Sequence, residues 1–150
     1  VRFPSNIDCE VHMHFSLVDR VIEVSPSRIV TLKQVSLAEE YLQDHFPTFP
    51  VLPGVMMLEC MVQASRRLLI ESKGESKSRH VLGMVRALKY GRFVKPGATL
   101  RIEVELVTQL DEDRFDLKGE VLLLEPGADP LERAVAASGR LTMRPLRVLN

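Results

Sequence analysis

A short stretch in the middle of the sequence combines an imidazole with backbone groups that can stabilise an anion. It runs from Asp44 to Gly54 and reads DHFPTFPVLPG, with three prolines three residues apart that fix φ and stiffen the chain. Such a loop can position His45, and imidazoles titrate near neutrality, as general acid–base catalysis requires. Pro53 and Gly54 open a helix, whose first N–H groups have no intrahelical acceptor. We therefore expect proton transfer at His45, beside amides able to polarise a carbonyl group.

A carboxyl group follows fourteen residues after this histidine. Glu59 lies in a predicted helix that is otherwise apolar, so its carboxyl group must be neutral, partnered or directed into a cavity. Gln63 comes one helical turn later and can orient the carboxyl group through a hydrogen bond. By spacing alone, the two residues equally well mark a narrow solvent-facing stripe. The adjoining loop favours the chemical interpretation.

The helix that carries Glu59 is predicted from Val55 to Ser72, a run without glycine or proline and rich in methionine, leucine and alanine. Its first ten residues are apolar on every side except at Glu59 and Gln63. A helix of this kind must be enclosed rather than laid on a surface. We therefore expect a sheet to wrap around it.

The remaining segments favour strands. A Ser-Pro turn separates two runs rich in β-branched residues, which predicts a hairpin. The run from Leu100 to Val107 alternates apolar and charged residues, as in a half-buried antiparallel strand. The second half is predicted to be a meander of about four strands. The hairpin spans Leu17–Val24 and Arg28–Val35, and the other strands Val81–Phe93, Leu100–Val107, Arg114–Leu124 and Arg133–Met143. The fold class is α+β, with a curved antiparallel sheet around one long buried helix.

The composition limits the classes of function. The 150 residues are 45% apolar, and 20 basic residues balance 20 acidic ones, which fits one domain over residues 1–150 and argues against a protein that neutralises many phosphates. No apolar run approaches the roughly 20 residues of a membrane span. We therefore expect a cytosolic protein that binds neither nucleic acid nor membrane. The two cysteines give no disulfide framework, and Cys60 is expected in the core.

One pair of histidines has the spacing of a metal site. His12 and His14 would present two imidazoles on one face of a strand, but a metal needs a third and a fourth ligand from elsewhere. The favoured interpretation is that both are half-buried or solvated histidines that bind no metal. We expect no metal and no other cofactor.

Three motifs together resemble a known family. HFP at 45–47, PVLPGV at 50–55 and LECMVQ at 58–63 are similar, in order and spacing, to the HFP, PVMPGV and LEAMAQ elements of hotdog-fold 3-hydroxyacyl-acyl-carrier-protein dehydratases of the FabZ type. Weaker similarity extends to Phe15, to Leu17–Val21, and to the segments Arg92–Phe93 and Lys95–Gly97. The resemblance covers roughly residues 15 to 107.

This resemblance implies an activity and a set of site residues. His45 would act as the general base on the α-carbon of a (3R)-hydroxyacyl thioester. Glu59, from the other subunit of a dimer, would be the general acid on the departing hydroxyl. The Gly54 amide would polarise the thioester carbonyl. The implied activity is that of a hydro-lyase of fatty acid biosynthesis that forms trans-2-enoyl thioesters. Implied substrate contacts are Phe46, Gly54, Val55, Met56 and Gln63.

Two departures from the family pattern and two alternative functions remain. The family has glycine where this chain has Asp44 and Thr48, which is costly if either position needs a positive φ. Hotdog domains also serve as acyl-thioesterases and as noncatalytic acyl-thioester-binding proteins. The carrier is acyl carrier protein or coenzyme A, and the assembly is a homodimer or a trimer of dimers. Four basic residues either present a positive edge to the carrier or are solvated: Arg86, Lys89, Arg92 and Lys95.

Overall fold

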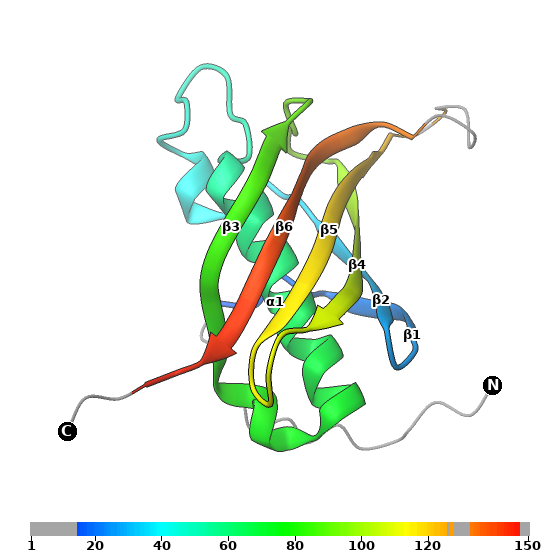
Figure 1. The fold of residues 1–150 in the computed structure, drawn as a ribbon. Coiled ribbons are helices and arrows are strands. Elements are labelled where there is room, and N and C mark those ends of the chain that lie inside the picture. Colours follow the sequence, from blue (N-terminus) through cyan, green and yellow to red (C-terminus); the bar gives the residue numbers. More distant parts are fainter. Residues whose placement is uncertain (1–14, 126, 128–132, 148–150) are drawn as a thin grey trace.

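The computed structural model describes residues 15–125, 127 and 133–147 and contains one antiparallel sheet and one long helix (Figure 1). The six strands lie in the order β1-β2-β4-β5-β6-β3. In chain order the elements are β1 (Arg20–Val24), β2 (Arg28–Gln34), η1 (Glu40–Leu42), α1 (Gly54–Lys73), η2 (Glu75–Arg79), β3 (His80–Tyr90), β4 (Thr99–Gln109), β5 (Phe115–Leu124) and β6 (Val135–Pro145). The predicted α+β class is confirmed. The prediction of one domain over residues 1–150 includes undescribed residues and stays a prediction.

The helix α1 forms where the sequence predicts it and lies against the sheet, which curves around it (Figure 1). It begins after Pro53 and ends at Lys73, where Gly74 adopts a φ of 99° and donates its N–H to the Ile70 carbonyl. Helix and sheet approach closely. A Cβ atom at Gly119 would lie 2.6 Å from the sulfur of Met61, so any larger residue on β5 would displace the Met61 side chain of the helix.

The sheet covers α1 from one side only. Met61, Ala64 and Leu68 are fully buried, but 65% of Val55 is exposed. Leu58 and Glu59 are half-buried. The expectation of a fully enclosed helix is therefore wrong for its first turns. A single curved sheet wraps one face of the helix and leaves the flank beside it open.

The strand predictions are confirmed except for one pairing. β1 and β2 form the predicted hairpin, and β4 buries alternate residues, as its sequence pattern predicts. However, β3 pairs with β6 rather than β4, so the meander has three strands, β4, β5 and β6. The reason is α1, which lies between β2 and β3 in the chain. After this helix the chain enters the sheet at the edge opposite β1. Residues 91–98 then cross back, held by hydrogen bonds from Leu52 N–H to Val94 and from Gly97 N–H to Val35.

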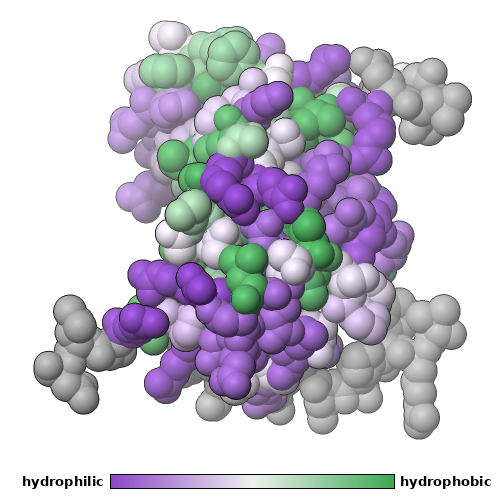
Figure 2. Space-filling model, in the orientation of Figure 1, coloured by the Kyte–Doolittle hydropathy of each residue, from purple (hydrophilic) through white to green (hydrophobic). Residues whose placement is uncertain are grey.

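The outer face of the sheet is mostly hydrophilic, with separate hydrophobic patches (Figure 2). On this face Asp116 of β5 accepts hydrogen bonds from Arg86 of β3 at 2.6 Å and from Arg140 of β6 at 2.8 Å. Burial raises the pKa of Asp116, but the hydrogen bonds from Arg140 and Arg86 outweigh it and hold the pKa below its ordinary value. The triad thus links three strands, including the edge strand β3. Within the described residues, no helix is both long and apolar enough to cross a membrane.

Replacing Asp116 should lower stability in a pH-dependent way. Because the folded-state pKa is depressed, the stabilisation is present above the ordinary aspartate pKa of about 3.9 and is lost as the pH falls through the folded-state pKa. We expect Asp116→Asn to lower the free energy of unfolding by about 2 kcal/mol at pH 7 and by less at pH 3. Urea titrations at both pH values measure this, with exposed Glu40→Gln as the control. An equal penalty at both pH values would contradict the prediction.

Candidate active site

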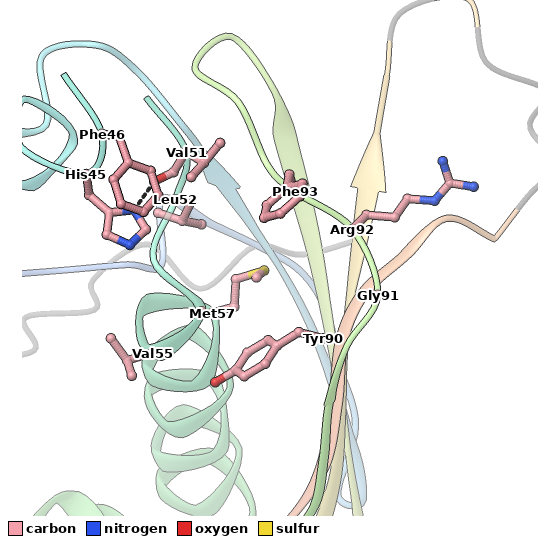
Figure 3. Close-up of a pocket in the computed structure, with 11 residues that line it drawn as sticks. His45, Phe46, Val51, Leu52, Val55, Met57, Tyr90, Gly91, Arg92 and Phe93 are labelled. Atoms are coloured by element: carbon pink, nitrogen blue, oxygen red, sulfur yellow. Dashed lines mark hydrogen bonds between the residues drawn. The ribbon is translucent and has the colours of Figure 1, made fainter. Parts of the chain in front are cut away.

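The loop between η1 and α1 holds His45 through a pair of bonds to one residue. The Val51 N–H donates to the His45 carbonyl at 2.9 Å, and Nδ1 of the His45 ring lies 2.8 Å from the Val51 carbonyl oxygen (Figure 3). A carbonyl oxygen only accepts, so Nδ1 carries the proton of the neutral ring. Nε2 is then left with its lone pair, as a general base requires. The ring stacks on Phe46, with centroids 4.6 Å apart.

Two interactions anchor this loop, one to strand β2 and one to the connection between β3 and β4. Lys33 of β2 donates from Nζ to Oε1 of Glu39 at 2.7 Å, and only 10% and 15% of the two side chains are exposed. Beyond His45, the Leu52 N–H bonds to the Val94 carbonyl. The ion pair fixes the segment that enters η1, and the backbone bond fixes the segment that enters α1. The histidine thus lies on a loop tied at both ends.

The two positions where the family has glycine do not adopt a positive φ in this chain. Asp44 and Thr48 are both exposed. Among the described non-glycine residues, only Ala87 has a positive φ, of 50°. The hydrogen bonds between Phe46 and Phe49 instead close the loop as a tight turn.

His45 lies at a cavity of about 580 Å³ whose walls are largely apolar (Figure 3). The loop, the first turn of α1 and the end of β3 form its walls. Because α1 begins at Gly54, the N–H groups of Gly54 and Val55 have no intrahelical acceptor beside the cavity. The lining residues are His45, Phe46, Val51, Leu52, Gly54, Val55, Met57, Tyr90, Gly91, Arg92 and Phe93.

This cavity brings together four of the predicted site residues: His45, Phe46, Gly54 and Val55. The other three, Met56, Glu59 and Gln63, do not line it, and their roles stay predictions. The four residues from Tyr90 to Phe93 were not predicted as site residues. The similarity of Arg92–Phe93 to the family's RF element marks this segment, but nothing in the sequence places it opposite His45. The Arg92 side chain points away from the cavity (Figure 3).

Glu59 is oriented by the residue that the helical spacing indicates. Gln63 donates from Nε2 to the Glu59 carboxylate at 3.0 Å, which confirms the predicted i,i+4 hydrogen bond. Only 2% of Gln63 is exposed, and its amide also donates to the Phe15 carbonyl and accepts from the Leu17 N–H at 2.8 Å. These backbone partners determine which end of the amide faces Glu59. The sequence contained no signal that residues 15–17 would complete this network.

The other candidate residues behave as ordinary side chains. Cys60 is 1% exposed, and burial raises the pKa of its thiol to about 12, which confirms it as a core residue. The pair His12 and His14 lies outside the described residues. Among the described residues, no group of three or more histidine, cysteine, aspartate or glutamate side chains is arranged to hold a metal ion.

Comparison with known proteins identifies the family. A model of the FabA-like domain matches residues 11–123. The chain belongs to the FabA-like family. A FabA-like relative, the 3-hydroxyacyl-[acyl-carrier-protein] dehydratase FabZ of Lactococcus lactis subsp. cremoris, is 35% identical over 130 residues, which are 85% of this chain and 83% of the relative. FabZ of Solibacter usitatus is 41% identical over 96 residues, 62% of this chain and 58% of the relative.

Two solved structures have a similar fold. The dehydratase heterocomplex ApeI:P from Xenorhabdus doucetiae superposes with a TM-score of 0.64 and 25% identity, over 88% of this chain and 84% of that chain. A Streptococcus mutans protein bound to acetyl CoA superposes with a TM-score of 0.63 at 15% identity, over 90% of this chain and 96% of that chain, and shows likeness of fold alone. The predicted hotdog fold is confirmed.

Breaking the ion pair behind the loop should destabilise the chain. Lys33→Met leaves the Glu39 carboxylate buried without its cation, and we expect the free energy of unfolding to fall by about 3 kcal/mol. Adding Glu39→Leu to Lys33→Met removes the unpaired charge, so the double variant should recover part of this loss. Chemical denaturation of the single and double variants measures both effects. If the loss in the double variant equals the sum of the losses in Lys33→Met and Glu39→Leu, the two side chains do not interact directly.

Proposed function

We propose that this chain dehydrates (3R)-hydroxyacyl-[acyl-carrier-protein] thioesters to trans-2-enoyl thioesters in fatty acid biosynthesis. The observation that carries the proposal is His45, whose Nε2 is free at an apolar cavity beside the first amides of α1. An imidazole base, amide donors and an apolar wall are what proton abstraction next to a thioester carbonyl requires. The 35% identity to a relative named FabZ, over 85% of this chain, supports the same reaction.

The proposed mechanism assigns one step to each group. Nε2 of His45 takes a proton from C2 of the substrate, and the Gly54 N–H stabilises the negative charge that develops on the thioester oxygen. The electron pair then forms the C2=C3 double bond as the C3–O bond breaks. The Glu59 carboxyl group protonates the departing hydroxyl, which leaves as water. The hydrogen bond from Gln63 holds the Glu59 carboxyl group in one orientation for this transfer.

The site is proposed to combine two subunits. In one chain Glu59 does not line the cavity of His45, so its carboxyl group has no part in that cavity. The open flank of α1 presents the exposed Val55 beside the half-buried Leu58 and Glu59. Among the described residues, strand β3 pairs with β6 alone, and its other edge has no partner strand, as in edge strands that pair with another chain. A homodimer would cover both surfaces and place Glu59 of the partner subunit at this cavity.

Acyl carrier protein is the proposed carrier, because the relatives at 35–41% identity are named for it. Of the predicted positive edge, Arg86 is bound to Asp116 on the outer face of the sheet. Lys95 lies with Nζ 5.0 Å from the centre of the Phe49 ring, next to the histidine loop. These contacts support a docking role for Lys95 more than for Arg86. The predicted cytosolic location stays a prediction.

Glu59→Gln should separate catalysis from binding. The amide keeps the shape of the side chain but cannot supply a proton, so turnover should fall by a factor of about 10² to 10⁴ with little change in thioester affinity. The reaction can be followed in both directions by the absorbance of the conjugated enoyl thioester. Leu37→Gln, at an exposed residue outside the site, is the control. If the parent chain binds acyl thioesters but converts neither the 3-hydroxyacyl nor the 2-enoyl thioester, it is a noncatalytic binding protein instead.

Complementation tests whether the site is shared. A His45→Ala chain and a Glu59→Ala chain should each be nearly inactive, while a mixture refolded together should regain activity, because a mixed dimer contains one site with both residues intact. The measurement is activity as a function of the mixing ratio. If equal mixtures stay as inactive as either parent variant although mixed dimers form, both residues act within one chain.

A further inference from the structure

Tyr90 is the last residue of β3 and reaches from the sheet to the start of α1. Its backbone pairs with Ala137 of β6, and its side chain lines the cavity that contains His45. Figure 3 shows the ring directed across the cavity toward the first turn of the helix. Half of the residue, 50%, is exposed, so a ligand can reach it. The fold alone gives no reason for a phenol at this position.

The ring lies directly against Gly54. A Cβ atom at Gly54 would be 2.8 Å from both Cε1 and Cζ of Tyr90, so the absence of a side chain at 54 is what admits the ring. Cζ is the carbon that bears the hydroxyl group. The hydroxyl is therefore held beside the residue whose backbone N–H has no intrahelical acceptor.

The Tyr90 hydroxyl is also unused by the protein. Within the described part of the chain it has no hydrogen-bond partner, whereas most polar groups that help to build a fold have one. The other polar side chains of the cavity are His45, whose Nδ1 is bound to Val51, and Arg92, which points away. Among the described residues, the Tyr90 hydroxyl and the Gly54 N–H are thus two unpaired donors, and they lie side by side where β3 meets the start of α1.

We propose that Tyr90 is a further catalytic residue, whose hydroxyl donates a hydrogen bond to the thioester carbonyl oxygen alongside the Gly54 N–H. This rests on the proposed dehydratase function. A carbonyl oxygen has two lone pairs and accepts two donors, and fixed donors in an apolar cavity stabilise the charge that develops on that oxygen. Tyr90 keeps its own proton throughout, and the reaction balance above is unchanged.

The chain provides a matched control, because it contains only two tyrosines. The hydroxyl of Tyr41 is likewise without a hydrogen-bond partner in the described structure, but it is buried, and its ring packs on Phe15 away from the cavity. Tyr90→Phe and Tyr41→Phe each delete one oxygen atom and keep the ring. Only the first removes a donor from the cavity.

The experiment measures turnover and the hydrogen bonding of the bound carbonyl in the same protein. We expect Tyr90→Phe to lower kcat by about 10²-fold, the usual effect of deleting one donor to a developing oxyanion, with little change in KM. Hydrogen bonding to the carbonyl shifts the absorbance of a bound 2-hexenoyl thioester to longer wavelength, and Tyr90→Phe should reduce this shift. Tyr41→Phe should retain both parental values. A Tyr90→Phe variant with parental kcat and parental absorbance shift overturns the proposal.

The two readouts distinguish this proposal from the proposed function. If the parent binds the hexenoyl thioester with a shifted absorbance but has no turnover, the dehydratase function fails. A shift lost in Tyr90→Phe then still supports the donor role. If the parent neither binds nor turns over the thioester, both proposals are overturned.

A second set of variants tests the close approach itself. Gly54→Ala should weaken hexenoyl thioester binding at least tenfold, because the new methyl group collides with the Tyr90 ring. Adding Tyr90→Ala removes that collision, so the double variant should bind more tightly than Gly54→Ala alone. The affinity of Tyr90→Ala alone is measured as well, because this change also removes part of the cavity wall. If the losses of the two single variants simply add in the double variant, the ring does not lie on Gly54 and the proposal is overturned.

Discussion

The packing of α1 against the inner side of one antiparallel sheet is the constraint on which the rest of the structure depends. Met61 and Leu68 are completely buried there, and Met61 packs directly on Gly119 of β5. Polar groups on such a helix need partners, because an unpaired buried group costs more than one net hydrogen bond contributes. The buried Gln63 amide has three partners, the Phe15 carbonyl, the Leu17 N–H and the Glu59 carboxylate. The contacts that offset the cost of burying this amide therefore also orient the Glu59 carboxyl group.

The connection from the sheet to the helix builds the other half of the site. The chain must leave β2, turn and enter α1 from its N-terminal end, and it does so through a loop closed by His45 and Val51. Lys33 and Glu39 tie the beginning of this connection to β2. The bond that closes the loop also places the proton on Nδ1, so loop geometry and base chemistry have one cause. A helix N-terminus beside this base follows directly from the connection.

One face of the helix remains uncovered in the single chain. The proposed acid lies on this open face, whereas the proposed base lies at the cavity. The sheet bends around α1 from one side, which leaves Val55 exposed and Glu59 half-buried and outside the cavity of His45. The base and the proposed acid thus face different surroundings within one chain. A second chain on the open flank would both bury this apolar surface and complete the proposed site. Stability and activity would then both depend on assembly.

The sequence by itself determined the features that depend on near neighbours. The hairpin, the limits of α1 to within one residue, the alternation in β4 and the bond from Gln63 to Glu59 all follow from periodicities over a few residues. Tertiary structure alone decided the pairing of β3 with β6, the backbone partners of Gln63 and the contact of Tyr90 with Gly54. These contacts join segments tens of residues apart. They depend on the edge of the sheet where the chain arrives after the helix, and local residue patterns do not specify that edge.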